Sequence, residues 1–164
     1  TSQIFQRKNL PEEMWHLYMR QDGSGVHRQG GSLSWRNNNP GNIVYGGFAK
    51  NNGAIGNNGR FAVFPDYQTG VGAVESLFDQ PTYRSLSLGG AMNRYAPKNE
   101  NDTDKYLSFI ERRTGLNRKK IISELSLNEK KSVVDAISVF EGFRKGDEFS
   151  FRKYQMANQD VDGE

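Results

Sequence analysis

The sequence places one carboxylate, Glu141, in an arrangement suited to acid catalysis. Ile137 lies four residues before it and shares its face of a helix, Phe140 precedes it directly, and Gly142 follows it. A carboxylate in the last turn of a helix lies at the negative end of the helix dipole, and apolar neighbours exclude water; both disfavour the ionised form. A carboxyl group kept protonated can donate a proton to a glycosidic oxygen, so Glu141 is a candidate general acid. The alternative from spacing alone is a solvated residue at a helix end.

Three other carboxylates compete with Glu141 or complement it. Glu13 falls in the first turn of a helix predicted over residues 9–20, where the positive end of the dipole favours the ionised form. Its simplest role is capping, and it is the reserve candidate for the acid. Asp147 and Glu148 follow Glu141 closely and are candidates for a second carboxylate that orients water or stabilises an oxocarbenium-like state. The alternative for them is an exposed pair of charges.

Helices must position these groups, and the second half of the chain has helical spacing. Asp66 is a cap for a helix that ends near Phe78, and a shorter helix is expected over residues 87–95. Asp102 or Thr103 caps a third helix, with Tyr106, Phe109 and Ile110 inward and Gly115 just past its end. Ser126 and Glu129 form a capping box for the last strong helix, which carries Val133, Val134, Ile137 and Phe140 and stops at Gly142.

The first half of the chain is different in composition. Residues 21–60 are rich in glycine and asparagine and are expected to form a long loop, of a kind that is usually either functional or disordered. Short strands are expected over residues 42–45 and 60–64. Residues 144–164 form a polar, charged tail whose end is expected to fray. The predicted fold class is therefore α+β, predominantly α, with a small Gly/Asn-rich β region and a helical lobe.

Composition limits the classes of function. With 164 residues, 35% of them hydrophobic, the whole chain is expected to be one domain, with residues 1–8 and 150–164 peripheral. The absence of cysteine excludes disulfides and thiolate sites, and two histidines make a zinc site unexpected, so we expect no metal and no cofactor. The net charge of +3 favours an anionic polymer as partner. The sequence shows no membrane span and no signal peptide.

Two motifs resemble those of peptidoglycan-cleaving enzymes. Residues 141–144, Glu-Gly-Phe-Arg, resemble the Glu-Gly-x-Arg that follows the catalytic helix of bacteriophage-type lysozymes, in which the glutamate is the acid. Residues 36–43, Arg-Asn-Asn-Asn-Pro-Gly-Asn-Ile, resemble a signature of peptidoglycan hydrolases from phage virions and secreted effectors. Segments similar to those that follow in that group occur here in the same order, at residues 59–64, 67–78, 93–97 and 100–106. The resemblance covers residues 34–146.

The resemblance implies a lysozyme-like fold with Glu141 as the acid. In ordinary lysozyme-like domains the acid-bearing helix precedes the β region, whereas here it comes last, so we expect a circular permutation. Relatives often carry a histidine just before this glutamate, and this chain has Phe140 there.

Three residues are candidates for substrate contacts. Asn42 is the candidate for a ligand contact within the asparagine block, whose other asparagines are expected to hold turns. Tyr45 and Tyr95 are candidate sugar platforms because a flat ring with a polar tip stacks on a pyranose face; the alternative is a half-buried core tyrosine. Tyr95 also matches a groove-lining tyrosine of similar transglycosylase-like domains.

The expected function is cleavage of the peptidoglycan glycan strand, by a muramidase or a lytic transglycosylase. We expect a monomer acting on the bacterial cell wall or in the periplasm, delivered by a phage particle or by secretion machinery, with an immunity protein as a further partner if it is an effector. The first alternative is a non-catalytic wall-binding or virion structural module. The second is a basic nucleic-acid-binding domain, which the leading reading excludes.

Overall fold

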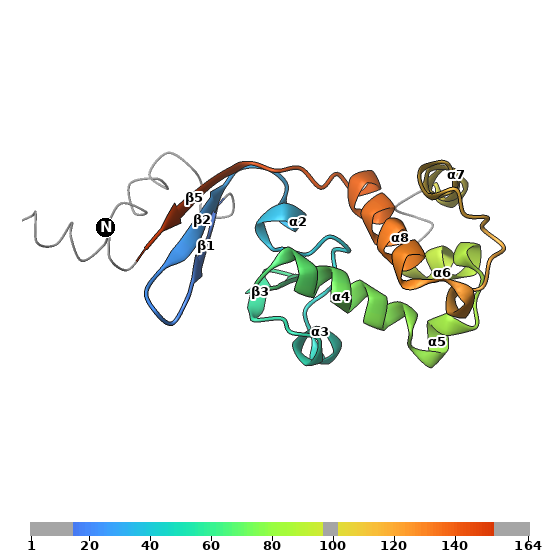
Figure 1. The fold of residues 1–164 in the computed structure, drawn as a ribbon, viewed down its shortest axis with the longest axis horizontal. Helices are drawn as coiled ribbons and strands as arrows, with labels where there is room; N and C mark the ends of the chain where they lie inside the picture. The colour runs from blue at the N-terminus through green and yellow to red at the C-terminus, as the bar shows by residue number, and fades with distance from the viewer. Residues whose placement is uncertain (1–14, 97–101, 153–164) are drawn as a thin grey trace, which may run out of the picture.

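The computed structural model describes residues 15–96 and 102–152, which form the predicted α+β arrangement with helices predominant. A three-stranded sheet lies at one end of the molecule and helices α5 to α8 at the other (Figure 1). The strands are β1 (Trp15–Met19), β2 (Gly25–Gln29), β3 (Gly56–Asn58), β4 (Phe61–Val63) and β5 (Asp147–Phe151). The helices are α2 (Leu33–Arg36), α3 (Gly47–Asn51), α4 (Tyr67–Phe78), α5 (Pro81–Arg84), α6 (Leu88–Tyr95), α7 (Thr103–Thr114), the 3-10 helix η3 (Ile122–Glu124) and α8 (Leu127–Phe140).

The four predicted helices after Asp66 are confirmed, together with their capping residues. The Asp66 carboxylate accepts from the Thr69 N–H at 2.8 Å and begins α4. Asp102 begins α7, which ends at Gly115 in the left-handed conformation. The capping box of α8 has both of its hydrogen bonds, between Ser126 and Glu129. Local side-chain chemistry fixes these boundaries because it supplies partners for the free N–H groups of a helix start.

The helix predicted over residues 9–20 is wrong wherever the structure describes it. Trp15–Met19 form β1, which pairs antiparallel with β2. Asp22 makes the turn between them, accepting from the Ser24 N–H at 2.9 Å, and Gly23 takes a φ of 86°. The apolar spacing fits a helix, but the Asp-Gly turn leads directly into a hairpin. Residues 9–14, with Glu13, lie outside the described part of the chain.

The end of the tail, which is expected to fray, lies beyond the described residues. The sequence did not indicate that Asp147–Phe151, earlier in the tail, form a strand. These residues form β5, which pairs antiparallel with β2 and places Phe151 opposite Gly25. The sheet order is therefore β1-β2-β5, with β2 in the centre. Phe151 is buried rather than peripheral. The pairing joins distant parts of the chain, and this is why local composition did not indicate it.

The Gly/Asn-rich stretch is more ordered than a loop. It contains β2, α2, α3 and β3. The strand predicted over residues 60–64 is confirmed as β4, which pairs with β3. The strand predicted over residues 42–45 is wrong, because it is reduced to a single bridge between Val44 and Phe61.

Buried asparagines organise the segment that follows α2. Asn37, Asn38 and Asn39 are all buried. The Asn39 amide donates to the Ile43 and Ala62 carbonyls at 2.9 and 3.0 Å, and its oxygen accepts from the Ile43 N–H at 2.9 Å. Asn38 and Asn42 both take positive φ, 53° and 51°, which asparagine tolerates better than most residues. These side chains replace the backbone pairing that an irregular segment lacks.

Arg28 connects the three-stranded sheet to this segment. One of its terminal nitrogens donates to the Trp35 carbonyl at 2.6 Å and to the Asn38 side-chain oxygen at 2.7 Å. Its Nε donates to Glu148 of β5 at 2.9 Å. The guanidinium also lies 4.7 Å from the centre of the Trp35 ring. A single side chain on β2 therefore contacts β5 on one side and the segment that carries Trp35 and Asn38 on the other.

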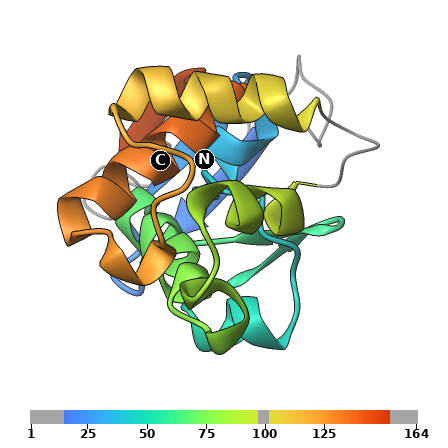
Figure 2. The same cartoon turned by 90° about the vertical axis from the view of Figure 1, so that its right-hand side faces the viewer.

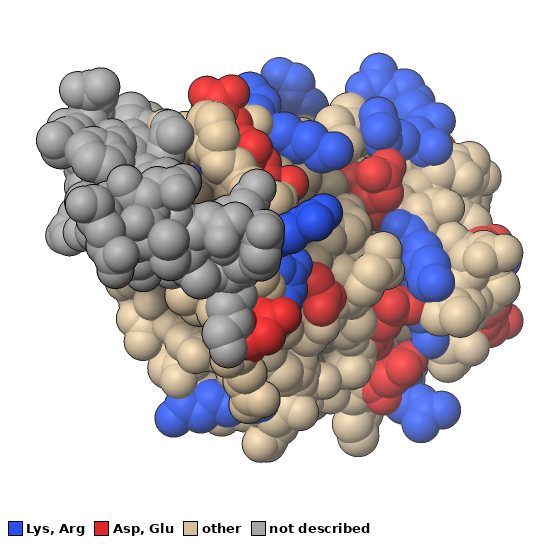
Figure 3. All heavy atoms as spheres, turned by 60° about the vertical axis from the view of Figure 1, so that its left-hand side comes forward, with Lys and Arg blue, Asp and Glu red and all other residues tan. Residues whose placement is uncertain are grey.

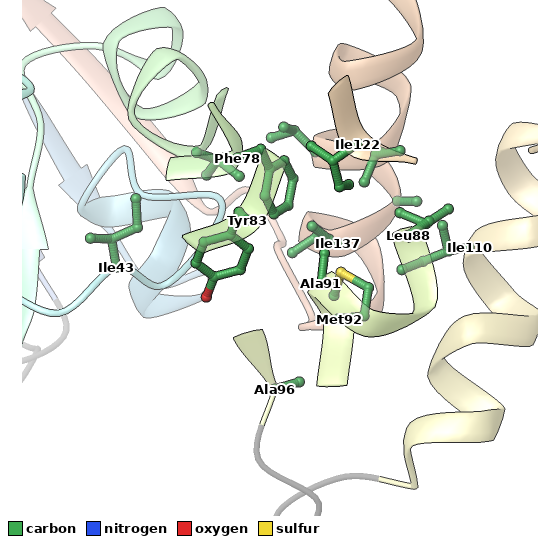
Figure 4. Close-up of a cluster of buried hydrophobic side chains, with 14 of the residues drawn as sticks. Ile43, Phe78, Tyr83, Leu88, Ala91, Met92, Ala96, Ile110, Ile122 and Ile137 are labelled. Atoms are coloured by element: carbon green, nitrogen blue, oxygen red, sulfur yellow. The ribbon is translucent and has the colours of Figure 1, made fainter. Parts of the chain in front are cut away.

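The core lies among the helices. Figure 2 shows α7 and α8 packed together with α6 beside them. Side chains from five helices and η3 converge there, as Figure 4 shows for Phe78, Tyr83, Leu88, Met92, Ile110, Ile122 and Ile137. None of the described helices has the length and apolar composition needed to cross a bilayer.

We expect Asn39→Ala to destabilise the fold by about 2 to 3 kcal/mol, because it leaves the buried Ile43 N–H and Ala62 carbonyl without their partner. Urea unfolding followed by circular dichroism measures the change. Asn128→Ala is the control, since Asn128 is exposed on α8 and its replacement is expected to change stability by less than about 0.5 kcal/mol. Equal stability of the two variants would contradict a structural role for the Asn39 side chain.

Candidate active site

Glu141 occupies the position where α8 ends. It is the C-cap residue, and its N–H donates to the Ile137 carbonyl at 2.9 Å. Gly142 follows with a φ of 84°. The Gly142 N–H donates to Val139 and the Phe143 N–H donates to Ser138, which is the hydrogen-bond pattern of a Schellman motif. The side chain of Glu141 therefore projects from a fixed helix end.

A tyrosine from another helix holds the carboxylate. The Tyr106 hydroxyl on α7 donates to Glu141 Oε1 at 3.1 Å. The Tyr106 ring is fully buried and stacks on Phe140 with ring centres 4.0 Å apart. Burial raises the pKa of the Tyr106 hydroxyl, and the charge of Glu141 raises it further. The hydroxyl is therefore a proton donor to Glu141 throughout the neutral pH range.

Glu141 lines a groove of about 360 Å³. The groove is bounded by the segment after the buried asparagines, by the start of β4, and by the region from α4 to α6. Its lining residues are Gly41, Asn42, Ile43, Val44, Phe48, Arg60, Phe61, Leu77, Tyr83, Tyr95, Ala96 and Glu141. Within the part of the chain that the structure describes, Glu141 is the one acidic residue of this lining. The carboxylate thus faces a largely apolar surface with a few polar groups.

Tyr95 joins the helical side of the groove to the opposite wall. It is half-buried at the end of α6, and its hydroxyl donates to the Gly41 carbonyl. A side chain at position 41 would begin 2.5 Å from the Tyr95 oxygen and 2.6 Å from Val74, so this close approach requires glycine. Burial raises the pKa of Tyr95, and Glu141 adds to the effect. Tyr95 is therefore a groove-lining residue whose hydroxyl is engaged within the protein.

Of the other two predicted contact residues, the structure places Asn42 in the groove lining but not Tyr45. Asn42 is half-buried and lines the groove with Glu141 and Tyr95. Tyr45 packs against the core, with the Lys50 ammonium 5.3 Å from the centre of its ring, and is not among the residues that line the groove. Its location matches the alternative of a half-buried core tyrosine.

Asp147 and Glu148 lie on β5, away from the groove. Both are exposed, and Glu148 forms an ion pair with Arg28 at 2.9 Å. Neither lines the groove with Glu141. The chain leaves α8 and runs toward the three-stranded sheet before it reaches these residues (Figure 1). Glu13, the reserve candidate, lies outside the described residues.

Sequence reasoning missed the role of Tyr106 and the contributions of Tyr83, Arg60 and Phe61 to the groove. Tyr106 was expected to point inward from α7, and it does, but its hydroxyl partner comes from a helix that begins more than ten residues after α7 ends. The helical period indicates which face is buried and carries no information about the partner across an interface.

No protein-family model matches this chain, and a comparison with curated proteins gives no significant match.

We expect Gly142→Ala to destabilise the protein by about 1 kcal/mol, because an L side chain at a φ of 84° is strained even though the surrounding space is open. Thermal unfolding measures the change. Gly72→Ala is the matched control: position 72 is also open but lies inside α4, where alanine is expected to stabilise the helix by roughly 0.5 to 1 kcal/mol. Effects of the same sign at both positions would contradict the strain argument.

Proposed function

We propose that the protein cleaves the glycan strand of peptidoglycan, with Glu141 as the general acid. One observation carries the proposal: a half-buried carboxylate lies in a groove, receives a tyrosine hydrogen bond, and forms no ion pair with a described residue. A carboxylate that served only solubility or stability would be expected to face water or a cation. The lysozyme-like and circularly permuted fold is part of the same proposal.

The groove supplies the conditions that this reaction needs. The Tyr106 hydroxyl fixes Oε1 of Glu141, and no described residue donates to Oε2. When protonated, Oε2 can transfer its proton to the glycosidic oxygen as the bond from that oxygen to the anomeric carbon breaks. Val44, Phe48 and Phe61 offer apolar surface for sugar faces and N-acetyl methyl groups. Asn42 is suited to hydrogen-bond an N-acetyl amide.

Two outcomes are compatible with this first step. In a muramidase, water adds to the oxocarbenium-like carbon and its proton is taken up by the carboxylate. In a lytic transglycosylase, the sugar's own 6-hydroxyl adds instead and gives its proton to the same carboxylate, so that an anhydro end forms without water. Because Glu141 is the one acidic residue of the described groove lining, both routes use this carboxylate alone for proton transfer.

The alternatives make different predictions for this site. A wall-binding or virion module that has lost its chemistry does not need a carboxylate held by a buried tyrosine. A nucleic-acid-binding surface would be expected to be continuously basic. Figure 3 shows basic and acidic side chains interspersed over the face that it presents. We therefore favour a bacteriolytic enzyme that acts on the cell wall after delivery by a phage particle or by secretion machinery.

We expect Glu141→Gln to lower the rate of release of soluble muropeptides from purified peptidoglycan by at least about 100-fold, because the amide cannot donate the proton. Glu148→Gln is the matched control and is expected to keep the parental rate. Mass spectrometry of the products separates water addition from an anhydro end. Release at an equal rate by the parent and by Glu141→Gln would mean that another residue is the general acid. No release by the parent would favour the non-catalytic binding module.

We expect Tyr106→Phe to lower kcat by about 10-fold with little change in KM, a smaller loss than for a donor that contacts the transition state itself. The Glu141 carboxyl group then loses the hydrogen bond that fixes its orientation in the groove. Tyr67→Phe is the control, because Tyr67 hydrogen-bonds Ser138 on α8 and does not line the groove. An unchanged kcat in Tyr106→Phe would reduce Tyr106 to a packing residue.

A further inference from the structure

Arg60 lies at a fixed point on the wall of the groove. It follows the turn between β3 and β4, where Gly59 takes a φ of 65°. Its carbonyl accepts from the Tyr45 N–H at 3.0 Å, and its neighbour Phe61 bridges to Val44. The backbone that carries the arginine is therefore held from both sides.

The guanidinium of Arg60 has no anionic partner in the described part of the chain. Its side chain is exposed, and no described carboxylate lies within ion-pair distance. Its nearest aromatic neighbour is Phe61, whose ring centre lies 5.7 Å away. Arg94, near the same groove, differs because it contacts the Tyr83 ring and hydroxyl. Arg60 thus lines the groove with its hydrogen-bond donors available.

Among the described residues, the groove lining carries one acid and one base. Glu141 and Arg60 come from different elements, α8 and the β3–β4 connection, and both line the same surface. A neutral disaccharide needs no cation for its recognition, whereas a guanidinium matches a carboxylate with two parallel hydrogen bonds. An arginine kept unpaired in such a groove is suited to an anionic group on the substrate.

We propose that Arg60 binds a carboxylate carried by the glycan strand and so makes cleavage selective for anionic strands. The inference rests on the proposed function and adds a specificity residue to it. Two parts of peptidoglycan supply a carboxylate near the sugar: the stem peptide, and the lactyl group once the peptide has been removed. Both present the same chemistry to Arg60.

The test compares soluble strands in three forms: with intact stem peptides, after amidase treatment that leaves only the lactyl carboxylate, and after conversion of all carboxylates to methylamides. We expect the parent to cleave the intact strands with a kcat/KM about 2- to 5-fold higher than the methylamides, as for one exposed ion pair. Arg60→Gln is expected to lose this preference, because its KM on the intact strands rises relative to its KM on the methylamides.

Arg112→Gln is the matched control. It makes the same change in net charge at an exposed position of α7 that does not line the groove, and it is expected to keep the preference. A preference retained by Arg60→Gln, or lost equally in both variants, would overturn the inference and leave the proposed function standing. Failure of the parent on all three substrates would overturn both. The amidase-treated strands show which carboxylate is bound, because only the lactyl group can restore the preference there.

Discussion

The groove depends on a buried polar side chain in a segment without regular structure. Asn39 is fully buried, and its amide holds the Ile43 backbone and the Ala62 carbonyl at the same time. A buried carbonyl or N–H without a partner is strongly unfavourable, so this part of the chain has few alternative conformations. The positive φ of Asn38 and Asn42 on either side gives the segment its turns. Gly41 and Asn42 reach the groove because this framework holds them there.

Two tyrosines connect the framework to the helices that carry the acid. Tyr95 reaches from α6 to the Gly41 carbonyl, and Tyr106 reaches from α7 to Glu141. Both hydroxyls have a raised pKa because of burial, so both remain donors. Hydrogen bonds from uncharged tyrosine donors therefore hold both the acid and the asparagine segment against the helices. Such bonds depend little on salt, unlike an ion pair at the surface.

The sequence predicts the structure well where the determinants are local. Asp66 and Ser126 are recognisable as helix N-caps from their residue types, and both helices form as expected. β1 and β5 were missed because a strand needs a partner, and the partner of β5 is distant in the chain. For the site, the spacing of apolar residues before Gly142 was enough to predict that a helix ends at Glu141. The hydroxyl of Tyr106 and the guanidinium of Arg60 were not, because contacts across elements leave no periodic signal.

The central position of β2 has a topological consequence. Arg28 and Glu148 are 120 positions apart in the chain, yet they lie on adjacent strands. The chain between them, which contains the groove and every helix of the described residues, is closed into a ring by the sheet. Closure of a long ring costs conformational entropy, whereas helices assemble from contacts between near neighbours. The pairing of β2 with β5 therefore joins the two ends of the helical part of the chain. New chain ends placed between the helices would leave this strand pairing intact.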